Sequence, residues 1–184
     1  LVESVDDALG TIRAGLKRLK LENDTIIIFT GDNGGKIGPT DNSPYRVGKG
    51  SAYEGGIRVP LIVYWPGVTK AGTTDATPNI THDLYPTVLE MTGIAAQQTI
   101  VDGVSLAPLL KSGAKVERDA LYWHYPHYPN QGAKPGGVVR DGDWKLIEFY
   151  ENNRRELFDL SKDPRESNNL AEKFPQEVER LAAM

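Results

Sequence analysis

The stretch that decides the fold of this chain is TIIIFTGDNGG, residues 25–35. Its first six residues form a short, continuous, β-branched run, which is typical of a strand buried inside a parallel sheet. A glycine-rich turn follows directly. We therefore predict a strand over residues 25–30 and a tight loop at its carboxyl end.

An amphipathic pattern precedes this strand. Apolar side chains recur there at alternating intervals of three and four residues, at Val2, Val5, Leu9, Ile12, Leu16 and Leu19. This spacing places them on one stripe of a helix. A helix, a short turn and a buried strand in succession are typical of an α/β layer fold. We therefore assign residues 1–110 to part of a main α/β domain.

The middle of the chain is expected to be mostly loop, because residues 31–72 hold ten of its 19 glycines. One apolar run within it, PLIVYW at residues 60–65, predicts a second strand. Beyond the loop, residues 81–91 predict a helix with Thr81 as its N-cap and Gly93 at its end.

The last part of the chain changes in character. Eight of the 15 aromatic residues lie between Tyr122 and Phe158. Short strand-forming runs recur there and predict antiparallel strands at residues 120–125, 137–140, 144–150 and 156–160. The turn Asp141-Gly142-Asp143 predicts a hairpin. Together with a final helix near residues 175–184, residues 111–184 are expected to form a small antiparallel β-sheet subdomain with a closing helix.

Composition excludes several classes of protein. A hydrophobic content of 39% can supply a core, so the chain is not disordered as a whole. The net charge of −4, from 21 basic and 25 acidic residues, and the lack of a long Lys/Arg run argue against a nucleic-acid partner. No apolar stretch approaches the roughly 18 residues of a membrane span. The absence of cysteine excludes disulfides, thiolate zinc sites and a cysteine nucleophile within these residues.

Two oxygen-bearing side chains, Asp32 and Asn33, follow the predicted strand of residues 25–30. Ligands bind at the carboxyl ends of strands in open α/β sheets. A carboxylate and an amide are hard oxygen donors suited to Ca²⁺ or Mg²⁺. The same residues are also typical of an ordinary turn in which Asx side chains bond the local backbone. From the residues alone, both interpretations stay open.

A second glycine-rich segment, GKGSAYEGGIRVP, occupies residues 48–60. A lysine between two glycines, Lys49, can approach an anion closely as a mobile point charge. It can equally be an ordinary surface lysine. The segment is not a P-loop, because the glycine spacing before the lysine is wrong and no helix led by Ser or Thr follows.

Taken together, these segments resemble the sulfatase family, and specifically the C-terminal portion of an arylsulfatase-type enzyme of the alkaline phosphatase superfamily. The resemblance covers nearly the whole chain in the family's order. Its motifs are VESVDD (2–7), FTGDNGG (29–35), GKG and YEGGIRVP (48–60), YWPG (64–67), HDLYPTVLEMTG (82–93), DGDWKL (141–146) and ELFDL (156–160).

The resemblance implies a calcium-dependent hydrolysis of sulfate esters, on a sulfated small molecule or a glycan. It assigns the metal ligands to Asp32 and Asn33, with Ca²⁺ as the ion and Mg²⁺ as the alternative. It assigns a catalytic, sulfate-binding role to Lys49. A cation and an ammonium group would together neutralise charge on the sulfuryl oxygens.

The family's nucleophile is a formylglycine, made from Cys or Ser in a Cys/Ser-x-Pro-x-Arg motif of the N-terminal half. The nearest match, Ser43-Pro44-Tyr45-Arg46, lacks the residue between Ser and Pro and is rejected. We therefore expect a piece of a longer protein that is inactive alone and needs the N-terminal part as partner. The resemblance also implies a periplasmic, extracellular or lysosomal location. The alternatives are a phosphodiester or phosphonate monoester hydrolase, and a non-catalytic metal- or carbohydrate-binding module.

The chain has three histidines. His82 opens the predicted helix of residues 81–91, where capping or exposure is expected. His124 and His127 are weak evidence for zinc, because no third ligand lies nearby in the sequence. The resemblance favours substrate binding by this pair, with packing of the small sheet as the alternative. We expect Trp144 and Lys145 to serve the structure of that sheet.

Overall fold

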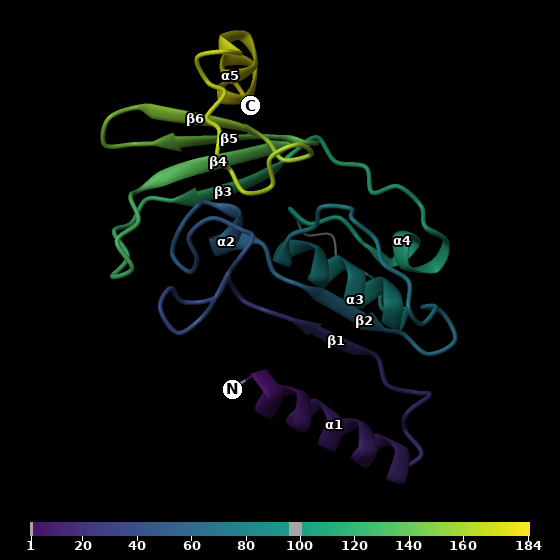
Figure 1. The fold of residues 1–184 in the computed structure, drawn as a ribbon. Coiled ribbons are helices and arrows are strands. Elements are labelled where there is room, and N and C mark those ends of the chain that lie inside the picture. The colour runs from purple at the N-terminus through teal and green to yellow at the C-terminus, as the bar shows by residue number, and fades with distance from the viewer. Residues whose placement is uncertain (1, 96–100) are drawn as a thin grey trace. The chain divides into compact units, whose positions relative to one another are not determined.

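The computed structural model describes residues 2–95 and 101–184 (Figure 1). The chain forms two compact units, and each is discontinuous in sequence. One unit comprises residues 1–30 and 61–116, and the other comprises residues 31–60 and 117–184. The domain boundary near residue 110 that the sequence suggests stays a prediction.

The first unit contains the amphipathic helix and the two predicted strands. Helix α1 spans Val2–Arg18, and strands β1 and β2 span Ile27–Thr30 and Leu61–Tyr64. The strands pair antiparallel with Ile28 opposite Val63. The expected strand positions are confirmed, but the partner seen for β1 runs antiparallel, whereas its sequence is typical of a parallel sheet. A β-branched run predicts a strand and does not fix the direction of its neighbour.

Two α-helices complete this unit, α3 (Leu84–Thr92) and α4 (Ala107–Ser112), with the 3₁₀ helix η1 (Thr81–Asp83) leading into α3. Gly93 ends α3 with a left-handed φ of 70°, as predicted. The short helix α4 was not predicted from the sequence, because six residues are too few to show a helical period.

The prediction that Thr81 is the N-cap is wrong, because Thr81 is the first residue of η1 and Ile80 holds the N-cap position. The side chain that bonds the backbone of the N-cap residue belongs to Asp83. Its Oδ2 accepts the Ile80 N–H at 2.9 Å and its Oδ1 accepts the Val104 N–H at 2.9 Å. Asp83 is fully buried. Hydrogen bonds to a carboxylate are stronger than those to a neutral hydroxyl, and the two oxygens of the carboxylate can each accept one backbone N–H.

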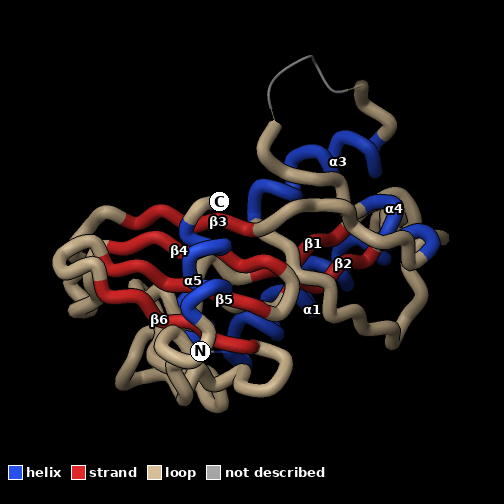
Figure 2. The backbone as a smooth tube through the Cα atoms, turned by 90° about the horizontal axis from the view of Figure 1, so that it is seen from above, coloured by secondary structure: helices blue, strands red, loops and turns tan. Residues whose placement is uncertain are grey.

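The second unit contains a four-stranded antiparallel sheet in the order β3-β4-β5-β6 (Figure 2). Its elements are β3 (Leu121–Tyr125), β4 (Gly136–Asp141), β5 (Trp144–Phe149), β6 (Arg154–Asp159) and helix α5 (Pro175–Ala182). Gly142, with a φ of 57°, lies in the β4–β5 hairpin. The small antiparallel sheet and its closing helix are therefore confirmed, and the fold class is mixed α/β.

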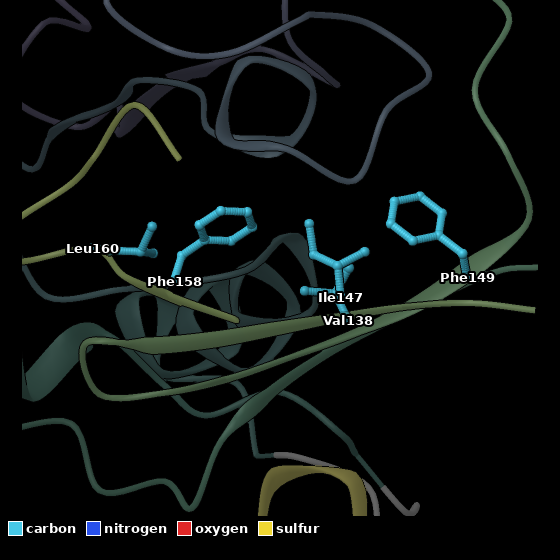
Figure 3. Packing of buried hydrophobic residues seen from close by; sticks show 5 residues of the cluster. All are labelled: Val138, Ile147, Phe149, Phe158 and Leu160. Atoms are coloured by element: carbon cyan, nitrogen blue, oxygen red, sulfur yellow. The ribbon is translucent and has the colours of Figure 1, made fainter. Parts of the chain in front are cut away.

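Both faces of this sheet bury apolar side chains. One face packs against α5, where Val139, Leu146 and Leu157 of the sheet form a cluster with Val178 and Leu181 of the helix. The other face contains Val138, Ile147, Phe149, Phe158 and Leu160, which stand together in Figure 3. Ala52 and Tyr53 pack against this second group. The segment around Lys49 therefore rests on the opposite face of the sheet from α5.

Helix α1 differs from the other helices, because none of its residues is buried. Ile12, in the apolar stripe predicted from the sequence, is 58% exposed. Within the described residues, no helix is both long and apolar enough to cross a membrane.

Candidate functional site

The turn that carries Asp32 and Asn33 is held by a glycine contact. Gly34 is buried, and its N–H donates to the carbonyl of Gly56 at 2.9 Å. A Cβ atom at Gly34 would lie 1.8 Å from the Gly55 carbonyl oxygen, so no larger residue fits there. This close approach packs the turn against helix α2, which spans Glu54–Ile57.

The segment that carries Lys49 meets the same turn. The Lys49 N–H donates to the carbonyl of Gly35 at 3.0 Å. A Cβ atom at Gly48 would lie 2.4 Å from that same carbonyl oxygen. Two segments separated in the sequence therefore lie side by side, with Asp32 and Lys49 both exposed.

Asn42, a residue that sequence reasoning missed, joins the two segments. Its Nδ2 donates to the carbonyls of Gly35 at 2.8 Å and Val47 at 3.1 Å, and its Oδ1 accepts the Gly35 N–H at 3.1 Å. The side-chain amide thus replaces a strand partner for Gly35. No motif marks this role, because a lone Asn in a loop is also an ordinary turn residue.

Helix α2 is anchored to the sheet through two side chains, those of Tyr53, the residue before the helix, and Glu54, its first residue. The Tyr53 hydroxyl donates to Glu156 Oε2 on β6 at 2.7 Å. The Arg46 guanidinium lies 4.1 Å from the centre of the Tyr53 ring. Burial and the hydrogen bond to the Glu156 carboxylate raise the pKa of the Tyr53 phenol, so the phenol stays protonated and continues to donate.

Glu54 makes the second anchor. Its Oε1 lies 2.9 Å from the ammonium of Lys145 on β5, and both side chains are buried. Lys145 therefore contributes to the structure of the sheet, as expected, and also contacts the segment that carries Lys49. Trp144 packs its ring against Phe174, with the two ring centres 5.4 Å apart. No pattern of the sequence indicates the Glu54–Lys145 contact, since the two residues are far apart along the chain.

The histidines lie on the surface and have different aromatic partners. His124 Nδ1 lies 2.7 Å from the Tyr150 hydroxyl. The ring of His127 stands edge-on to that of Tyr125 with the centres 5.4 Å apart. The structure therefore does not join His124 and His127 through a shared partner. His82 is exposed, as expected.

The connection between β3 and β4 approaches the segment that carries Lys49. A Cβ atom placed on Gly50 would lie 3.1 Å from Gln131 Oε1, so the Gln131 side chain contacts this glycine. His127 belongs to the same connection. This contact brings the β3–β4 connection, which contains His127, to the segment that carries Lys49. No feature of the sequence indicated Gln131.

The chemistry of Asp32 and Asn33 fits a hard divalent cation in part. Their oxygens are of the kind that Ca²⁺ prefers, but Ca²⁺ takes about six to eight oxygen ligands. Across residues 2–95 and 101–184, no group of three or more His, Asp or Glu side chains is placed to hold a metal. The two residues can therefore supply part of a calcium site, and further ligands must come from elsewhere.

The fold and the joined loops define a class: an α/β protein in which a turn that carries a carboxylate and an amide lies against a segment that carries a glycine-flanked lysine. Residues 47–183 match the family model described as N-sulphoglucosamine sulphohydrolase, C-terminal. The chain belongs to the sulfatase family and corresponds to the C-terminal portion of its members.

Individual proteins agree with this result. A sulfatase from Formosa agariphila is 36% identical over 96% of this chain and 35% of its own length. The solved structure of BT4656 in complex with its substrate D-glucosamine-2-N,6-O-disulfate matches with 29% identity and a TM-score of 0.79, over 99% of this chain and 37% of that one. The phosphonate monoester hydrolase of Agrobacterium radiobacter matches with 28% identity and a TM-score of 0.79, over 100% and 38%. The chain thus spans little more than a third of these proteins.

Proposed function

We propose that this chain supplies part of the active site of a calcium-dependent sulfatase that hydrolyses sulfate esters. The observation that carries this proposal is the junction of the two loops. The Lys49 N–H bonds the Gly35 carbonyl, and the Gly34 N–H bonds the Gly56 carbonyl. A candidate cation site and a candidate anion site are thereby adjacent, as the binding of a metal-held sulfate requires.

In this proposal, Asp32 and Asn33 hold the metal through their side-chain oxygens. Bound there, Ca²⁺ supplies positive charge to the sulfate oxygens. Lys49 adds a second positive charge from the neighbouring loop and stabilises negative charge that develops on the ester during hydrolysis. The exposed position of both Asp32 and Lys49 supports a role toward a ligand.

The rest of the site is proposed to come from the N-terminal part of the same protein. This chain has no cysteine and no Cys/Ser-x-Pro-x-Arg motif, so a formylglycine nucleophile would lie outside it. The chain alone is then inactive. A periplasmic, extracellular or lysosomal location belongs to the same proposal.

His124 and His127 are proposed to bind the substrate, which we take to be a sulfated glycan or a smaller sulfate ester. Both are exposed and lie among aromatic rings, which suit stacking on a sugar. The contact of Gln131 with Gly50 supports this assignment, because it brings their region to the Lys49 segment. The sulfated substrate of BT4656 is of the proposed chemical class.

The decisive experiment substitutes the metal ligand in the whole protein. Asp32→Ala is expected to lower calcium affinity in a calorimetric titration by at least about tenfold and to abolish hydrolysis of an aryl sulfate, because one charged ligand is lost. Lys49→Ala is expected to keep calcium affinity and lower kcat/KM by roughly 100-fold, the order found when one transition-state donor is removed. Asp24→Ala and Lys36→Ala are the matched exposed controls. Unchanged activity in Asp32→Ala would remove Asp32 from the site.

Substrate recognition has its own test. His124→Ala in the whole protein is expected to reduce turnover of a sulfated oligosaccharide more than that of a small aryl sulfate, since only the larger substrate reaches the aromatic region. His82→Ala, which changes an exposed histidine of the other unit, is the control. Equal losses on both substrates would assign His124 to packing.

The likeness to a phosphonate monoester hydrolase supports a second candidate function. A whole protein that cleaves a phosphodiester or phosphonate monoester in preference to an aryl sulfate would establish that activity instead. A whole protein that binds calcium or carbohydrate but turns over neither ester would be the non-catalytic binding module.

A further inference from the structure

Strand β5 carries a fully buried cation. Lys145 has 0% of its surface exposed, although lysine is almost never buried without a partner. By the alternation of a strand it shares a face with Ile147 and Phe149, the face shown in Figure 3. In the β5–β6 register it lies opposite Phe158. Lys145 is therefore a charged position within an apolar face.

Two buried carboxylates meet this ammonium. Lys145 Nζ lies 2.9 Å from Glu54 Oε1 and 2.8 Å from Glu166 Oε1. Glu166 Oε2 also accepts the backbone N–H of Glu54 at 2.6 Å. Glu54 is thus held twice, through its side chain and through its main chain. We call Glu54, Lys145 and Glu166 the buried ion cluster.

With both carboxylates ionised, the cluster carries one negative charge in excess, and two arginine guanidinium groups lie near it. The second oxygen of Glu54, Oε2, lies 3.5 Å from Arg58 and 4.0 Å from Arg140. Removing one partner from a buried ion pair leaves an uncompensated charge away from water, which is strongly unfavourable. The position of Glu54 is therefore tied to the presence of Lys145.

Glu54 is also the first residue of α2, on which both halves of the candidate site rest. The Gly56 carbonyl of α2 receives the Gly34 N–H of the metal turn. A Cβ atom at Gly56 would lie 2.6 Å from the Gly48 carbonyl oxygen, so the Lys49 segment touches α2 as well. A shift of Glu54 would move α2, and with it the Asp32 turn and the Lys49 segment.

We propose that Lys145 is a positioning residue for the sulfate site. It acts through Glu54 and α2 to fix Lys49 beside the Asp32–Asn33 turn. It touches no substrate, and its effect is on the placement of groups that do. This inference rests on the proposed function for its kinetic readout, and on the contacts alone for its structural readout.

The structural test is hydrogen exchange of the whole protein bearing Lys145→Met, a nearly isosteric change that removes the charge. Exchange is expected to rise at least about tenfold in residues 31–57. Strands β4 and β6 should change less, because the methyl group preserves the apolar packing. Lys162→Met, which alters an exposed lysine of the same unit, is the control. An equal rise throughout the sheet, or no rise in residues 31–57, would overturn the proposal.

The kinetic test is a double-mutant cycle with Lys49→Ala, measured as kcat/KM for an aryl sulfate. Lys145→Met is expected to lower kcat/KM about 10- to 100-fold when Lys49 is present and less than about threefold when it is absent, because coupled residues are not additive. A merely stabilising residue would lower it by the same factor in both backgrounds. That outcome would overturn the proposal.

Two further measurements keep the test decisive. If Lys145→Met does not fold, Glu166→Gln replaces it, since the amide oxygen can still accept the Glu54 N–H and Lys145 keeps Glu54; it should show the same pattern at smaller size. If the unsubstituted protein hydrolyses no sulfate ester, the proposed function fails. Calcium chloride titration then decides the positioning role, with at least about fivefold weaker binding expected in Lys145→Met than in Lys162→Met. Equal binding would overturn it.

Discussion

The two units of this chain use their apolar residues differently. The unit of residues 31–60 and 117–184 buries both faces of its sheet. In the other unit, α1 has a regular apolar stripe, but none of its residues is fully buried, and only Leu9 and Leu16 of the stripe are half-buried. A helical period therefore states which side of a helix is apolar, and the tertiary structure decides whether that side is covered. The candidate site lies in the unit whose sheet is covered on both faces.

The largest expected effect is the loss of a core ring. Phe158→Ala in the whole protein should lower the free energy of unfolding by about 3–5 kcal/mol, because Phe158 is fully buried and its removal leaves a cavity. Denaturant unfolding followed by tryptophan fluorescence measures this loss. Phe174→Ala, at a partly exposed ring, is the control and should cost less. Equal losses would mean that the core on this face is not the main support of the unit.

A smaller effect is expected at the junction of the loops. Asn42→Asp keeps the acceptor for the Gly35 N–H but removes the donors to the carbonyls of Gly35 and Val47. The Gly35 carbonyl keeps the Lys49 N–H as a donor, and the Asn42–Val47 bond is exposed, so the loss of these two hydrogen bonds should cost about 1–2 kcal/mol in stability. Hydrogen exchange in residues 31–57 should rise with the change. Asn79→Asp, whose one bond of 3.4 Å lies on the surface, should have little effect.

The contributions of two carboxylates, Glu166 and Glu151, to the stability of the protein should change with pH in opposite directions. Burial raises the pKa of the Glu166 carboxyl despite Lys145, so the folded protein holds this proton more tightly than the unfolded chain. Its contribution to stability therefore falls as the pH rises through the folded pKa. Hydrogen bonds from Lys134 and Tyr128 lower the pKa of Glu151, so its contribution is lost as the pH falls.

These signs are measured by comparing stability with and without each carboxylate. The stability difference between the unsubstituted protein and Glu166→Gln should decrease with rising pH above about 4, by at most about 1.4 kcal/mol per pH unit. The difference for Glu151→Gln should run the other way. Urea midpoints at a series of pH values provide the data. Parallel curves for the two variants would contradict the difference between a buried and an exposed carboxylate.

The smallest effect is expected on α1. In the 184-residue chain, Ile12→Ser should change stability by less than about 0.5 kcal/mol, because the side chain is already 58% exposed. In the whole protein the same change should cost more if the N-terminal part covers this stripe. Thermal unfolding of both forms makes the comparison. A cost above about 1 kcal/mol in the short chain would show that α1 is covered within these residues.

Much of the fold could be predicted because its signals are local. The apolar run of β1, the strand-forming run of β5 and the Gly142 hairpin all depend on neighbouring residues, and the structure has these elements close to the predicted positions. Strand direction and the contacts of Asp83 were less predictable. The antiparallel partner of β1 and the bond from the Val104 N–H to the Asp83 carboxylate depend on residues that are distant in the sequence.

The sequence by itself indicated the class of protein, because motif spacing and residue type are properties of the chain, and the resemblance to the sulfatase family suggested the roles of the candidate site residues. It marked Asp32, Asn33 and Lys49 as a set. Only the tertiary structure decided how such residues are held. The Asn42 amide and the Glu54–Lys145–Glu166 cluster join segments up to about a hundred residues apart. Burial makes those contacts strong, and burial exists only after the chain has folded.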